Sequence, residues 1–220
     1  MTRSRADQES ADALIVFGVT GDLARRRLFP ALYELEEEGA LDIPVVGVSR
    51  STEDDDALRR RARESLDFVG MTVDESVFDR LASRLSHVPG DYRDEETFRR
   101  IGEAVGEHTC TVSYLAIPPE LFDDVIQGLA AAGLNDRGRV VVEKPFGRDE
   151  VSARELSEII HRHYPEERVY RIDHFLGKEA LQNLMVFRFS NTMLEPIWNR
   201  HFIRGVQLTL AEDFGVEGRG

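Results

Sequence analysis

Short apolar segments alternate with longer amphipathic stretches along most of the chain. The apolar segments run for about five to eight residues and the amphipathic ones for about ten to eighteen, a pattern typical of strand–helix–strand units in a parallel sheet covered on both faces. The pattern predicts strands at residues 13–17, 44–48, 111–117, 139–143 and 169–172, with a short strand near 87–89. It predicts helices at residues 23–38, 54–68, 74–85, 95–107, 120–132 and 150–163. The predicted fold class is therefore α/β, with a Rossmann-like, doubly wound parallel sheet.

The pattern changes after Tyr164-Pro165. A helix at residues 178–187 and a long strand at 202–210 are predicted there, but too few apolar segments follow to build a sheet around that strand. We therefore expect the start of a second, α+β domain. The expected organisation is a disordered tail over residues 1–12, a Rossmann-like domain over 13–172 and an incomplete α+β domain over 173–220.

Composition and charge narrow the class of protein. Hydrophobic residues make up 41% of the chain, mean hydropathy is −0.34, and no apolar run approaches the roughly 18 residues that a membrane span needs. The polar first residues lack the apolar centre of a secretory signal, so we expect a soluble, cytoplasmic protein with no membrane partner. A net charge of −13 argues against nucleic acid as a partner. The lone Cys110 cannot form an internal disulfide, and we expect no metal site.

The first predicted strand runs into the turn GVTG at residues 18–21, and Asp22 can cap the helix that follows. The free N–H groups and positive dipole end of such a helix suit a pyrophosphate. The spacing G-x-x-G-x-x-A departs from the common G-x-G-x-x-G of dinucleotide-binding turns, so an ordinary strand–helix turn stays open as the alternative. Arginines at residues 25–27 oppose the helix dipole unless an anion lies nearby, which favours a bound phosphate.

The second predicted strand leads directly to Arg50. An enzyme that prefers NAD usually has an acidic side chain here to bind the ribose 2′-hydroxyl, whereas an arginine can bind the 2′-phosphate of NADP. Arg50 therefore indicates NADP as the cofactor. A solvent-exposed arginine beside Glu53 and Asp54 stays open as the alternative.

Only two of the 28 basic residues are lysines, Lys144 and Lys178. Lys144 follows a buried strand in VVVEKPFG, at the sheet edge where ligands of doubly wound folds gather. Lys178 follows Asp173 and His174 in RIDHFLGKE, where a carboxylate, an imidazole and an ammonium can bind a phosphorylated or hydroxylated ligand or move a proton. A structural histidine with a flanking ion pair is the alternative. Because lysine is a compact donor of tunable proton affinity, its use at these two positions indicates a functional pair. The remaining histidines are interpreted as surface or packing residues; they are His87, His108, His161, His163 and His201.

Together these segments resemble one family, the glucose-6-phosphate dehydrogenases. The resemblance is carried by GVTGDLARRRLFPALYEL, GVSR, YLAIPP, EKPFG, RIDHFLGKEALQNLMVFRFSN, PIWNR and EDFGVEGRG, which extend from residue 18 to the end of the chain. It implies a Rossmann domain followed by an α+β substrate domain. It also implies oxidation of glucose 6-phosphate at C1 to 6-phosphogluconolactone with NADP, the reaction that opens the pentose phosphate pathway.

The resemblance also implies a role for particular residues. The coenzyme is expected to contact Gly18, Thr20, Gly21, Asp22, Leu23, Arg50, Asp91, Tyr92 and Lys144. The substrate is expected to contact Lys144, His174, Lys178 and Glu212, with Lys144, Asp173 and His174 as the catalytic residues. Pro145 is expected to be cis. Phe175 stands where the family usually has tyrosine, which removes a hydroxyl expected to help bind the phosphate.

The proton-accepting histidine of this family lies downstream of EGRG. We therefore expect a truncated chain without the catalytic base, which binds NADP but turns over sugar phosphate inefficiently, and which forms homo-oligomers only if the C-terminal domain is present. Two alternatives stay open. One is a catalytically silent NADP-binding module, and the other is a different Rossmann sugar oxidoreductase with a Glu-Lys-Pro strand end, such as the glucose-fructose oxidoreductase type, against which RIDHFLGKE argues.

Overall fold

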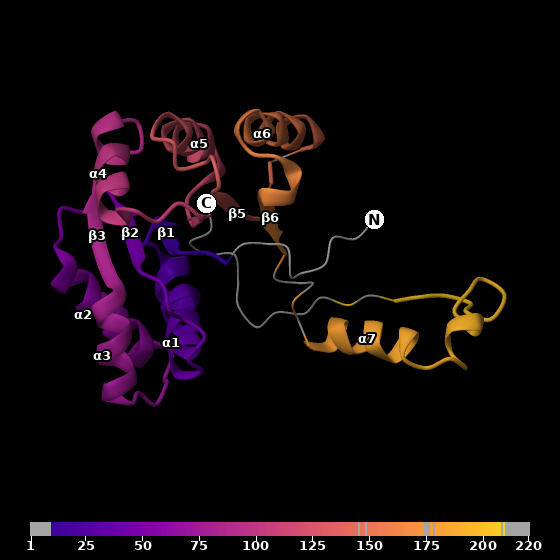
Figure 1. The fold of residues 1–220 in the computed structure, drawn as a ribbon. Coiled ribbons are helices and arrows are strands. Elements are labelled where there is room, and N and C mark those ends of the chain that lie inside the picture. Colours follow the sequence, from indigo (N-terminus) through magenta and orange to yellow (C-terminus); the bar gives the residue numbers. More distant parts are fainter. Residues whose placement is uncertain are drawn as a thin grey trace. The chain divides into compact units, whose positions relative to one another are not determined.

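The larger part of the chain is built around a six-stranded sheet, shown in Figure 1. The computed structural model describes residues 10–144, 146–147, 149–173, 177, 179–207 and 209. The strands are β1 (Ala13–Phe17), β2 (Val45–Ser49), β3 (Leu85–Pro89), β4 (Thr111–Leu115), β5 (Arg139–Glu143) and β6 (Val169–Ile172). All neighbours pair in parallel, in the order β3-β2-β1-β4-β5-β6. The strand order reverses between β1 and β4, the point where such sheets bind ligands, and the predicted doubly wound α/β fold is confirmed.

Helices cover both faces of this sheet. One face carries α1 (Phe29–Glu37), α2 (Asp55–Phe68) and α3 (Glu75–Arg84), and the other carries α4 (Glu95–Val105), α5 (Phe122–Ala131) and α6 (Glu150–His163) (Figure 1). Alternate residues of β1 enter the two cores, because Ile15 and Phe17 pack with α4–α6 whereas Val16 packs with α1–α3. The strand is thus buried on both sides, which explains why its sequence is apolar throughout.

Aspartates define where several helices begin. The caps are Asp54 before α2, Asp74 before α3, Asp94 before α4 and Asp149 before α6, and each carboxylate accepts a hydrogen bond from a backbone N–H of the first turn. Such bonds stabilise the ionised carboxylate. Hydrogen bonds from the Ser76 hydroxyl and from backbone N–H groups accordingly lower the pKa of Asp74. These caps explain why the four helices begin within one residue of their predicted positions.

Several elements differ from the sequence prediction, and two differences in the first unit have a physical reason in the structure. The helix predicted at residues 23–38 begins as a π-helix, Ala24–Leu28, before α1 continues it. The Phe29 N–H bonds to the Ala24 carbonyl, and the Ser65 hydroxyl on α2 donates to the Arg25 carbonyl, so a contact from a neighbouring helix supports the wider turn. The second difference is that β4 ends at Leu115 rather than at residue 117. The Ala116 N–H still donates to the Phe17 carbonyl at 3.0 Å, but Pro118 and Pro119 have no N–H with which to extend the ladder further.

The rest of the chain forms a separate unit. The chain divides into Met1–Ile172 and Asp173–Gly220. The described residues of the second unit contain α7 (Glu179–Phe189) and a 3₁₀ turn at Glu195–Ile197. The strand predicted at residues 202–210 is wrong for residues 202–207, which form no strand. A strand requires a hydrogen-bonded neighbour, and the described part of this unit contains no other strand to pair with.

Helix α7 exposes apolar side chains at successive positions. Met185 is 56% exposed, Val186 60% and Phe187 52%, so apolar groups lie around the helix rather than on one face. With 11 residues it is much shorter than the roughly 20 residues that span a bilayer. Among the described residues, no helix has both the length and the apolar character that crossing a membrane requires.

The Glu36 carboxylate joins α1 to α3 and gives the first testable prediction. Its side chain is 3% exposed and accepts hydrogen bonds from Arg80 Nε at 3.0 Å and Arg84 Nε at 2.7 Å. Replacing Glu36 with Gln keeps the shape but removes the charge that both arginines share. We expect Glu36→Gln to lower the free energy of unfolding by about 1–3 kcal/mol in urea titrations.

The matched control is Glu37→Gln at the exposed neighbouring position. An exposed surface substitution of this kind should change the free energy of unfolding by less than about 0.5 kcal/mol. Equal losses in the Glu36 and Glu37 variants would show that the buried ion pairs do not stabilise the contact between α1 and α3.

Candidate functional site

The turn after β1 is built around Gly18. This residue has a φ of +81°, and a Cβ at its position would lie 2.2 Å from the Ala116 carbonyl oxygen. Only glycine fits, because the backbone is left-handed and the ends of β1 and β4 approach closely. The Gly18 N–H donates to the Val48 carbonyl at 2.9 Å, and the Gly21 N–H donates to the Gly18 carbonyl at 2.9 Å. These bonds close the turn, in which Thr20 is half-buried.

Asp22 does not cap the following helix, contrary to the sequence prediction. Both of its carboxylate oxygens lie 2.8 Å from Arg26 Nε. The first backbone bond of the helix joins the Arg25 N–H to the Gly21 carbonyl at 3.1 Å, so the N–H groups ahead of it have no intrahelical acceptor. They are donors of the kind that bind phosphate groups.

The arginines that follow the turn have partners within the protein. The guanidinium groups of Arg25 and Arg26 lie 4.1 and 4.9 Å from the centre of the Phe68 ring, at the range of cation–π contacts. Packing on Phe68 and the ion pair of Arg26 account for these two cations. The inference from the sequence that these arginines favour a bound phosphate stays a prediction.

Tyr92 connects the turn to the neighbouring strand. Its hydroxyl accepts a hydrogen bond from the Gly18 N–H at 3.0 Å and donates one to the Val48 carbonyl at 3.2 Å. The side chain is 6% exposed, and burial raises the pKa of the phenol, so the hydroxyl keeps the proton that it donates. The preceding Asp91 is exposed, and its carboxylate accepts the Arg93 N–H at 3.0 Å. The Tyr92 side chain thus links two backbone groups, the Gly18 N–H of the turn and the Val48 carbonyl of β2.

Arg50 follows β2 at the same edge of the sheet. Its positive charge acts on the Tyr92 phenol, where it partly offsets the effect of burial on the pKa. The two acidic neighbours have other partners, because Glu53 pairs with Arg61 at 2.9 Å and Asp54 accepts a backbone N–H of α2 at 2.8 Å. The Arg50 side chain is exposed and forms no ion pair with the described residues. Its guanidinium can therefore bind an anion from solution.

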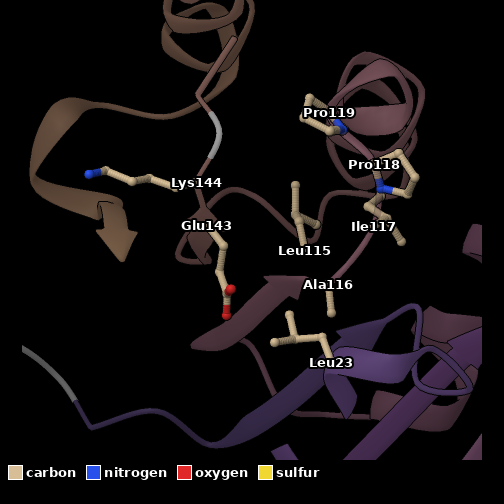
Figure 2. Close-up of a pocket in the computed structure, with 8 residues that line it drawn as sticks. All are labelled: Leu23, Leu115, Ala116, Ile117, Pro118, Pro119, Glu143 and Lys144. Carbon is tan, nitrogen blue, oxygen red and sulfur yellow. The ribbon is translucent and has the colours of Figure 1, made fainter. Parts of the chain in front are cut away.

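A cavity of about 210 Å³ lies at the ends of β4 and β5. It is lined by Leu23, Leu115, Ala116, Ile117, Pro118, Pro119, Glu143 and Lys144. Figure 2 shows the apolar side chains along one wall and Lys144 extending away from the Glu143 carboxylate. The cavity thus combines an apolar wall, which suits a flat ring, with charged groups at the end of β5.

Tyr114 is a residue of this region that the sequence pattern did not single out. Its hydroxyl donates a hydrogen bond to the Glu143 carboxylate across the neighbouring strands β4 and β5. The bond fixes a carboxylate at the wall of the cavity. The segment YLAIPP contains this tyrosine, but a single tyrosine in an apolar strand is indistinguishable from a core residue in sequence alone.

The described candidate residues of the first unit gather along one edge of the sheet. They are Gly18, Thr20, Gly21, Asp22, Leu23, Arg50, Asp91, Tyr92 and Lys144, all at or just beyond a strand end. Asp173 is the first residue of the second unit and is described separately from them. The predictions for Pro145, His174, Phe175, Lys178 and Glu212 lie outside the described residues. In the part of the chain that is described, no group of three His, Cys, Asp or Glu residues could hold a metal ion.

Comparison with known proteins gives one family. The model of the glucose-6-phosphate dehydrogenase NAD binding domain matches residues 15–183, and that of the C-terminal domain matches residues 185–220. Glucose-6-phosphate 1-dehydrogenase 1 of Mycobacterium tuberculosis is 43% identical over 213 residues, which are 96% of this chain and 45% of that protein. The enzyme of Dickeya dadantii is 40% identical over 211 residues, 94% of this chain and 43% of that protein. The chain thus spans less than half the length of these relatives.

Solved structures agree with the sequence matches. The crystal structure of glucose-6-phosphate 1-dehydrogenase from Mycobacterium avium has a TM-score of 0.89 and 43% identity, and covers 96% of this chain and 46% of that chain. A glucose-6-phosphate dehydrogenase in complex with its substrate glucose 6-phosphate has a TM-score of 0.86 and 35% identity over the same shares. A family model matches most of the sequence, and the chain accordingly belongs, as predicted, to the glucose-6-phosphate dehydrogenase family and contains its nicotinamide dinucleotide-binding domain.

Proposed function

We propose that this protein oxidises glucose 6-phosphate at C1 to 6-phosphogluconolactone, with NADP as the hydride acceptor, at the entry of the pentose phosphate pathway. Family membership supports the reaction class, and the similar enzyme solved with glucose 6-phosphate supports the substrate. The observation that carries the choice of NADP is Arg50, an exposed guanidinium at the end of β2 with no ion pair among the described residues.

The described residues fit a nicotinamide dinucleotide with a 2′-phosphate. When bound, NADP supplies the nicotinamide ring that accepts the hydride. The free N–H groups at the helix start after Gly21 would bind the pyrophosphate. The Arg50 guanidinium would bind the 2′-phosphate through charge-assisted hydrogen bonds. The apolar wall that includes Leu23 and Pro118 would cover the nicotinamide ring and exclude water from it.

Lys144 and the residues after β6 are proposed to act on the sugar phosphate. Lys144 lies at the end of β5 on the cavity wall, where its ammonium can stabilise negative charge on the C1 oxygen as the proton leaves. His174 and Lys178 would bind the phosphate, and Glu212 would accept hydrogen bonds from sugar hydroxyls. Asp173 would orient His174, since a carboxylate fixes the tautomer of a neighbouring imidazole.

The reaction itself is tested by following NADPH absorbance when the intact protein is mixed with NADP and glucose 6-phosphate. We expect NADPH formation, and a much lower rate with unphosphorylated glucose, because binding of the phosphate orients the reacting C1 hydroxyl. NADP binding without NADPH formation would indicate a silent nucleotide-binding module instead. Faster turnover of another sugar would favour a different oxidoreductase activity.

The role of Arg50 is tested by Arg50→Ala. One charge-assisted hydrogen bond to phosphate is worth about 1.5–3 kcal/mol, so the Kd for NADP should rise about 10- to 100-fold. The Kd for NAD, which has no 2′-phosphate, should stay within about twofold of the parent value. Calorimetry or fluorescence titration of both cofactors measures the ratio. The control is Arg60→Ala on the exposed face of α2, which should leave the ratio unchanged, and an unchanged ratio in Arg50→Ala itself would refute the assignment.

Lys178 is tested by Lys178→Arg. The planar guanidinium cannot occupy a site shaped for a compact ammonium, so we expect the Kd for glucose 6-phosphate to rise by about tenfold, or about 1.4 kcal/mol. The Kd for NADP should stay nearly the same. Calorimetry with each ligand separates these effects, and an unaltered affinity for glucose 6-phosphate would remove Lys178 from the substrate site.

A further inference from the structure

His87 on β3 contacts the segment that carries Arg50. The half-buried ring has its Nδ1 2.8 Å from the Glu53 carbonyl oxygen and its Nε2 3.0 Å from the Ser49 hydroxyl. The backbone N–H of the same residue donates to the Asp55 carboxylate at 2.6 Å. One residue of β3 therefore contacts the end of β2, the loop after it and the start of α2. The interpretation of His87 as a surface or packing residue did not anticipate these contacts.

The chemistry of the partners defines the hydrogen bonds. A carbonyl oxygen can only accept, so Nδ1 carries the proton and donates to Glu53. In the neutral ring Nε2 then accepts from the Ser49 hydroxyl, whose side chain is 2% exposed. The ring thus links a buried strand residue to the main chain of the loop.

The loop at residues 50–53 has little other support from the sheet. Among the described residues, the bond from His87 to Glu53 is the only hydrogen bond between the main chain of this loop and the sheet. The Glu53 side chain pairs with Arg61 on α2 at 2.9 Å, and the Ser49 carbonyl accepts the Gly90 N–H at 2.9 Å. The residues before and after Arg50 are therefore fixed, and His87 contacts both.

We propose that His87 is a positioning residue that determines the preference for NADP over NAD by holding the Arg50 loop in the conformation that binds the 2′-phosphate. The inference rests on the proposed function, in which Arg50 binds that phosphate. A loop that is fixed before binding loses less conformational entropy when it meets the ligand. NAD lacks the 2′-phosphate and does not use Arg50, so loosening the loop weakens NADP binding selectively.

The test compares dissociation constants for NADP and NAD in variants of the intact protein. In His87→Ala we expect the Kd for NADP to rise about three- to tenfold, and the Kd for NAD to change by less than about twofold. His87→Asn should restore part of the preference, because the Asn amide can donate to the Glu53 carbonyl as Nδ1 does. His108→Ala, at an exposed histidine outside this cluster, should change neither constant.

A double variant separates positioning from direct contact. In the Arg50→Ala background, adding His87→Ala should have no further effect on the NADP to NAD ratio, because the group that His87 positions is gone. If His87→Ala proves too unstable to purify, Ser49→Ala removes only the contact to Nε2 and should give a smaller selective loss of NADP affinity. Equal losses for NADP and NAD in either variant would overturn the proposal.

Failure of the inference is distinguishable from failure of the proposed function. If Arg50→Ala lowers the preference for NADP and His87→Ala does not, His87 has no positioning role while the 2′-phosphate site stands. If Arg50→Ala itself leaves the preference unchanged, the proposed 2′-phosphate site is wrong, and the role of His87 is overturned with it.

Discussion

The close approach of β1 and β4 at Gly18 is the constraint on which the predicted coenzyme edge depends. A Cβ at this position would meet the Ala116 carbonyl oxygen at 2.2 Å, so the strands reach this separation only with glycine. The same approach brings the Gly18 N–H to the Val48 carbonyl at 2.9 Å and to the Tyr92 hydroxyl at 3.0 Å. These contacts join the ends of β1, β2 and β4, and the segment after β3 that carries Tyr92, at Gly18. The position of Arg50, two residues beyond Val48, follows from this joint because β2 is held there.

An anionic cofactor requires local positive potential in a chain whose net charge is −13. The charge of the whole molecule is largely screened beyond a Debye length of about 8 Å at physiological salt, so the nearby groups decide. Two carboxylates of this region are paired with arginines, Asp22 with Arg26 and Glu53 with Arg61. Arg50 and the free N–H groups of the helix start are therefore opposed by few uncompensated charges.

The sheet and its covering helices could be predicted from the sequence because their apolar and polar residues recur with a short, regular spacing along the chain. Residues 13–17, 139–143 and 150–163 match β1, β5 and α6 at both ends. The π-helix at Ala24–Leu28 could not be predicted, because it is supported by Ser65, which is distant in the sequence. The strand expected at residues 202–210 is absent over residues 202–207, because strand formation depends on a hydrogen-bonded partner and the described part of the second unit contains no other strand.

Within the site, the sequence could predict which candidate residues lie at strand ends, but it could not predict which contacts orient their side chains. Gly18, Arg50 and Lys144 follow apolar strands, and the parallel topology brings strand ends to one edge whatever the side chains do. The partner of Asp22 could not be inferred in this way, because a carboxylate at a helix start can bond either to a backbone N–H or to a cation one turn later, and Arg26 competes successfully. That outcome matters for the chemistry. A capping carboxylate would occupy N–H groups and add negative charge where a pyrophosphate must bind, whereas the ion pair with Arg26 leaves those donors free and neutralises the charge beside them.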